Sequence, residues 1–104
     1  MKLKYDSDVL RRFCRTSGIA RLELFGSAAT EDFRSDSDVD LLCTLTPKKD
    51  SQCGLLEWVE IQLALEAIFG HPVDLVSRRA IERSRNPYRK EAILAHPQLL
   101  YAEG

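Results

Sequence analysis

The chain has 104 residues, of which 44% are hydrophobic and 30% are charged, and its formal net charge is −1. This balance is typical of an ordinary globular domain and excludes a disordered chain, and the near-zero net charge gives no general attraction to nucleic acid or to an acidic membrane surface. The length lies within the usual range for one domain, so we expect residues 1–104 to form a single domain.

The first half of the chain predicts one helix and two strands. A helix over residues 7–14 begins at a serine that can cap it and is followed by a glycine that can end it. Leucines alternate with charged residues over 21–25, which indicates a short, half-exposed strand. A polar loop over 26–37 leads to a second strand over 38–45, and a proline then opens an exposed turn over 47–50.

The second half predicts a long helix, a third strand and two further helices. The helix over 51–69 is apolar on more than one side, so it is covered on more than one side or provides the interface of an oligomer or hetero-complex. A strand over 72–77 follows, then a helix over 78–84 and another that Asn86 caps. This order of elements predicts an α+β (α/β-like) domain, with a small mixed β-sheet flanked by helices.

The cysteines and the apolar runs bear on the cellular compartment. Cys14, Cys43 and Cys53 form neither a C-x-x-C pair nor an even set for disulfides, and none has zinc-finger spacing. We therefore expect reduced thiols and a cytoplasmic location. No apolar run reaches the roughly 18 residues that span a bilayer, and residues 1–6 lack the apolar stretch of a secretory signal.

Three aspartates on predicted strands are candidate metal ligands. Asp38 and Asp40 are two residues apart, so on a strand both project from the same face. Two carboxylates so close repel each other unless a cation lies between them, and Mg²⁺ prefers oxygen ligands. Asp74 lies within the third strand, where an aspartate is disfavoured unless a partner satisfies it. The alternative is that all three are solvated acids, with Asp74 on an edge strand facing water.

A candidate phosphate site directly follows the first strand. Gly26 allows a phosphate to approach the backbone, and Ser27 offers a hydroxyl and an N–H to phosphate oxygens. Gly-Ser alone is common in turns. Its combination with the Asp-x-Asp pair, which follows Ser27 after ten intervening residues, points to a phosphate cradle beside a metal site.

The combination resembles the minimal nucleotidyltransferases of the polymerase-beta-like nucleotidyltransferase superfamily. The similarity covers nearly the whole chain and rests on Phe25-Gly26-Ser27, Arg34, Ser37-Asp38-Val39-Asp40-Leu41-Leu42, Pro72-Val73-Asp74-Leu75-Val76 and Asn86-Pro87-Tyr88-Arg89-Lys90-Glu91-Ala92-Ile93-Leu94.

This resemblance implies the fold of that superfamily and a Mg-dependent nucleotidyltransferase of the protein adenylyltransferase type. The three aspartates would be catalytic and would hold two Mg²⁺ ions, while Gly26, Ser27 and Arg34 would bind the nucleotide. ATP would be the donor, and the acceptor would be a hydroxyl of a separate protein, by family analogy a tyrosine on a cognate HEPN toxin. The chain would then be the antitoxin of a toxin–antitoxin pair.

One departure from the family keeps other hypotheses open. The family often has arginines where this loop has Ala28 and Thr30. A weak or degenerate transferase that neutralises its partner by binding alone is therefore the alternative function. The basic residues over 78–90 could contact nucleotide phosphates or an acidic partner, or form a solvated face. Nucleic acid is not favoured, because Tyr88 is the only aromatic residue among them.

Overall fold

The computed structural model describes residues 3–26 and 37–103. Its helices are α1 (Ser7–Ser17), α2 (Pro47–Gln52), α3 (Leu55–Phe69), α4 (Arg78–Glu82) and α5 (Pro87–Leu94). Its strands are β1 (Ile19–Phe25), β2 (Val39–Leu45), β3 (Val73–Ser77) and β4 (Gln98–Ala102). Within this part of the chain, no helix is long and apolar enough to cross a membrane.

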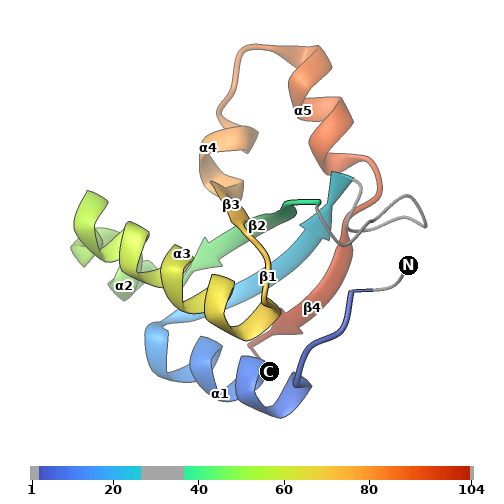
Figure 1. Cartoon of the computed structure of the whole chain (residues 1–104). Coiled ribbons are helices and arrows are strands. Elements are labelled where there is room, and N and C mark those ends of the chain that lie inside the picture. The colour runs from blue at the N-terminus through green and yellow to red at the C-terminus, as the bar shows by residue number, and fades with distance from the viewer. Residues whose placement is uncertain (1–2, 27–36, 104) are drawn as a thin grey trace.

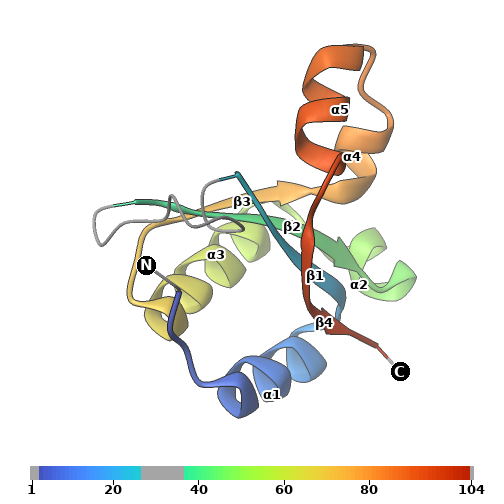
Figure 2. The same ribbon diagram turned by 90° about the vertical axis from the view of Figure 1, so that its right-hand side faces the viewer.

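The strands form one mixed sheet in the order β3-β2-β1-β4 (Figure 1). β1 runs antiparallel to both β2 and β4, whereas β2 and β3 are parallel. Figure 2 shows α1 and α3 on one face of the sheet and α4 and α5 on the other. The predicted α+β class, with a small mixed sheet flanked by helices, is confirmed.

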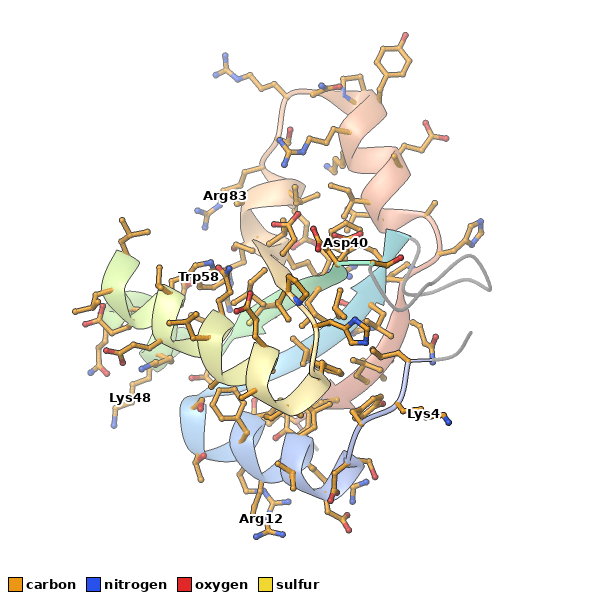
Figure 3. The ribbon with its side chains drawn as sticks, in the orientation of Figure 1. Lys4, Arg12, Asp40, Lys48, Trp58 and Arg83 are labelled. Carbon is orange, nitrogen blue, oxygen red and sulfur yellow. The ribbon has the colours of Figure 1, made fainter. Side chains whose placement is uncertain are left out.

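The main core lies between the sheet and the helices α1 and α3. Alternation along β2 turns Val39, Leu41, Cys43 and Leu45 into this core, as the sequence predicts. Trp58, labelled in Figure 3, packs against the same core from α3 and is partly buried. The opposite face carries the residues between these, including Asp40 and Leu42, and α4 covers part of it with the buried Ile81.

The predicted continuous helix over 51–69 is wrong, and so is the predicted turn over 47–50. The chain instead forms α2 and α3, which are separated at Cys53 and Gly54. Thr46 starts α2 because its hydroxyl accepts the Lys49 N–H at 3.3 Å. Gly54 then starts α3, and its N–H donates to the Glu57 carboxylate at 3.0 Å. Local capping thus overrides the apolar pattern that seemed continuous in the sequence.

The two ends of the chain also differ from the prediction. α1 is longer than expected and is capped by Asp6, whose carboxylate accepts the N–H groups of Asp8 and Val9, while Gly18 ends it at a φ of 75°. The sequence pattern missed β4 altogether. This strand is recruited by pairing with the outer edge of β1, where Gln98 lies opposite Leu24.

Candidate functional site

Asp40 and Asp74 face each other on neighbouring strands. They are Cα partners in the parallel register of β2 and β3. The Val39 N–H donates to the Pro72 carbonyl at 2.8 Å, which holds the starts of the two strands together. The residues on either side of both aspartates are buried toward α1 and α3, so alternation directs the aspartates to the opposite face (Figure 3).

Asp38 lies just outside the strand that was predicted to contain it. β2 begins at Val39, so strand alternation does not determine the direction of the exposed Asp38 side chain. The pKa of Asp40 is nevertheless raised, first by its burial and then by the negative charges of Asp74 and Asp38. Asp74 and Asp38 are therefore each close enough to Asp40 to repel its carboxylate.

The exposure of Asp74 agrees with either hypothesis made for it from the sequence. β3 is an edge strand and Asp74 is exposed, as an acid that simply faces water would be. Its register opposite Asp40 is the feature that associates it with a second carboxylate.

The donor chemistry of this cluster fits a divalent cation. All three side chains offer carboxylate oxygens, which Mg²⁺ prefers. Burial is the largest cause of the raised pKa of Asp40, and the neighbouring negative charges that add to it are charges that a cation would offset. Within residues 3–26 and 37–103, no three His, Cys, Asp or Glu side chains converge closely enough to form a complete metal site. A cation here would need further oxygen ligands, such as those of a triphosphate.

Gly26 lies against the carboxylate of Asp40. Phe25, at the end of β1, is the Cα partner of Asp40, so the next residue passes directly beside that side chain. Gly26 has a φ of 64°, and a Cβ atom added to it would lie 2.5 Å from the Asp40 Oδ2 atom. The backbone angle therefore favours glycine, and any larger residue here would displace the Asp40 carboxylate. Ser27 and Arg34, the other predicted nucleotide-binding residues, lie outside the described residues.

An ion pair that the sequence pattern did not predict lies on the same face of the sheet. Glu23 was expected on a half-exposed strand, but only 2% of its surface is accessible. Its Oε1 atom accepts from Arg78 Nη1 at 2.6 Å and lies 3.2 Å from Arg21 Nε. Strand alternation puts Glu23 on the face of Asp40, two residues further along the sheet. Strand alternation was the one signal in the sequence that could have predicted Glu23 on the face of Asp40.

The basic residues after β3 divide into two groups. Arg78 binds Glu23, while Arg79 donates to the Leu45 carbonyl at 2.8 Å and lies 3.4 Å from Asp50, so both tie α4 to the rest of the fold. The remaining arginines of this segment are exposed, and Figure 3 labels one of them directly after the end of α4. They are Arg83, Arg85 and Arg89.

The cysteines form no site within the part of the chain that the structure describes. All three are free, and Cys14 and Cys43 are buried in the core. Burial raises the pKa of each of these two thiols to about 12. They are structural residues that stay protonated at neutral pH.

Comparison of the sequence with known proteins identifies the family of this chain. Residues 7–100 match the family model described as the nucleotidyltransferase domain. A protein of Methanocaldococcus jannaschii, whose name assigns it provisionally to the protein adenylyltransferases, is 30% identical over 91 residues, which cover 88% of this chain and 83% of that protein.

Solved structures share the fold. A structure described as a minimal nucleotidyltransferase superposes with a TM-score of 0.65 at 32% identity, over 88% of this chain and 85% of that one. A complex of tri-AMPylated Shewanella oneidensis HEPN toxin with its MNT antitoxin contains a chain that superposes with a TM-score of 0.60 at 16% identity, over 92% of this chain and 69% of that one. The mixed four-stranded sheet is thus that of the polymerase-beta-like nucleotidyltransferases, and the chain belongs to the nucleotidyltransferase domain family, as a minimal nucleotidyltransferase.

Proposed function

We propose that this protein transfers AMP from ATP to a hydroxyl group of a separate partner protein, a HEPN-type toxin, and is the cytoplasmic antitoxin of that pair. The observation that carries the proposal is the placement of Asp40 opposite Asp74, with Gly26 against the Asp40 carboxylate, at one end of the sheet. This arrangement puts acidic oxygens and a backbone without a side chain at the same point.

Each residue of the site has a defined part in the proposal. Gly26 lets the phosphates approach the backbone, and Ser27 and Arg34 bind them. Asp38, Asp40 and Asp74 would hold two Mg²⁺ ions, whose charge would stabilise the entering and leaving oxygens during an in-line displacement.

The proposed transfer needs only ATP and the acceptor hydroxyl as reactants. The acceptor hydroxyl oxygen forms a bond to the α-phosphorus while the bond from that phosphorus to the bridging oxygen of pyrophosphate breaks. Pyrophosphate leaves with the electron pair of that bond. In this proposal Asp74, which is exposed and lies opposite Asp40, accepts the hydroxyl proton.

The choice of donor and acceptor is supported by the similar proteins. The Methanocaldococcus jannaschii relative carries the name of a protein adenylyltransferase. Among the structures with the same fold, one is a toxin–antitoxin complex with AMP-PNP and another contains an AMPylated HEPN toxin. This support is by analogy, so the acceptor must be tested directly.

The test is the intact mass of the partner after incubation with this protein and Mg-ATP. We expect a HEPN-type partner protein to gain one or more AMP units. Asp40→Asn should abolish the gain by removing a charged ligand without changing the side-chain volume. Asp8→Asn, an exposed change on α1, should leave the gain intact. Undiminished transfer by folded Asp40→Asn protein would refute the assigned role of this site.

A second candidate function is neutralisation by binding alone. It is favoured by one observation, the presence of Ala28 and Thr30 where the family often has arginines. The same experiment separates the two functions. A tight complex in which the mass of the partner never changes, even at high ATP concentration, would establish a binding antitoxin with the transferase fold.

A further inference from the structure

The outer side of α3 carries the main exposed apolar surface among the described residues. Among the described residues, seven large hydrophobic side chains are more than a third exposed, and four of these seven lie on α3. They are Leu55 at 81%, Leu56 at 69%, Val59 at 38% and Leu63 at 57%. The other three are scattered over α1, α5 and β4. A contiguous exposed apolar patch of this kind indicates an interaction site.

Four residues of α3 form a continuous line along this outer side. Leu56, Val59, Leu63 and Ala67 are spaced by three or four residues, so they stack on one face of the helix. All four are exposed, whereas Ile61, Leu65 and Phe69 occupy the opposite face and are buried in the core. We call this line the α3 seam. Its length of about 16 Å, at 1.5 Å per residue, suits contact with another helix.

Acidic residues border the α3 seam on both sides. At 100° per residue, Glu60 lies beside Leu63 on one flank and Glu66 lies on the other. Glu66 also accepts the Val73 N–H at 2.9 Å, and Glu60 is exposed. α3 contains three glutamates and no lysine or arginine. Two copies of this helix would therefore bring like charges together along both flanks, which disfavours self-pairing.

We propose that the α3 seam is the docking site for an amphipathic helix of a partner protein, one with an apolar stripe bordered by lysine or arginine residues. The apolar line provides the contact area, and the two acidic flanks select the basic partner. The seam lies on the helix layer that covers one face of the sheet (Figure 2). Asp40 and Asp74 project from the other face, because their strand neighbours are buried toward that helix layer. This proposal does not depend on the proposed transferase activity.

Two synthetic helical peptides test the proposal by fluorescence anisotropy. Both have leucines at the a and d positions of a heptad repeat; one has lysine at e and g, and the other has glutamate there. We expect the full-length protein to bind the lysine peptide, with an affinity that falls as salt is added, and to bind the glutamate peptide at least about 10-fold more weakly.

Three variants connect this binding to the α3 seam. Leu63→Asp should weaken binding of the lysine peptide by about 100-fold, because it puts a charge in the middle of the apolar line. Val9→Asp, at an exposed apolar position on α1, should leave binding unchanged. Glu60→Lys should shift the preference toward the glutamate peptide.

Several results would overturn the proposal. These are equal binding of the two peptides, no binding of either, or unchanged binding by Leu63→Asp. A stable dimer of the protein in sedimentation experiments, abolished by Leu63→Asp, would instead identify a second copy of this chain as the occupant. Asp40→Asn should bind the peptide normally, so a failure of the transfer scheme would be distinguishable from a failure of this one.

Discussion

Replacing Gly26 by alanine should strongly reduce the rate of AMP transfer while costing little stability. At a φ of 64°, an alanine pays about 1 kcal/mol for its Cβ in the left-handed region. In a domain of this size that corresponds to a fall in Tm of about 4–8 °C. The new Cβ would also lie 2.5 Å from the Asp40 Oδ2 atom, so the carboxylate must retreat by about 1 Å to reach ordinary contact distance.

Displacement of the Asp40 carboxylate in Gly26→Ala should lower the rate of AMP transfer. A misplacement of about 1 Å at a reacting centre can reduce a rate about 100-fold, and we expect a loss of that order in AMP transfer to the partner. The loss would be measured as the initial rate of the mass increase, beside thermal melts.

Gly70→Ala is the matched control for the backbone strain. Its φ is 70°, and an added Cβ there would meet no atom within 4 Å. It should therefore lower Tm by a similar amount and leave the transfer rate unchanged. If both variants transferred AMP equally well, the contact between Gly26 and Asp40 would have no role in the site.

Two further predictions follow from buried groups. Glu23→Ala should destabilise the fold by about 3 kcal/mol in chemical denaturation, because it leaves Arg78, which is only 25% exposed, without the carboxylate it binds; a loss below about 1 kcal/mol would show that the pair is effectively solvated. In the native protein at pH 8, iodoacetamide should modify Cys53 but neither Cys14 nor Cys43, whose pKa values near 12 leave about one thiolate in 10⁴. Mass spectrometry should show three modified cysteines after denaturation, and native modification of either buried thiol would contradict the packing described for the core.

The parts of the fold that the sequence predicted correctly are those determined by local patterns. Strand alternation placed Val39, Leu41 and Cys43 in the core and Asp40 on the other face, because a strand has a period of two wherever it pairs. The start of the last helix was similarly predicted, and α5 begins at Pro87 after its cap Asn86.

The features that the sequence did not predict depend on distant partners. β4 has no alternation of its own, with Leu99 half exposed, and exists because β1 has a free edge to pair with. The burial of Glu23 requires Arg78, which is 55 residues away along the chain. The proximity of Asp74 to Asp40 was suggested by the family resemblance, but the parallel register of β2 and β3 is what produces it.

The sheet lies between the candidate transfer site and the α3 seam, so the two surfaces can change independently in evolution. The carboxylates that would perform transfer project from one face, while the α3 seam lies on the helix layer that covers the other. A substitution that weakens nucleotide binding, such as the loss of loop arginines, therefore changes no residue of the α3 seam. Partner binding through that seam could then persist after catalysis is lost. The two proposed functions, AMP transfer and binding alone, therefore differ by changes on one face of the sheet, and the mass of the partner after exposure to Mg-ATP tests which of the two proposals holds.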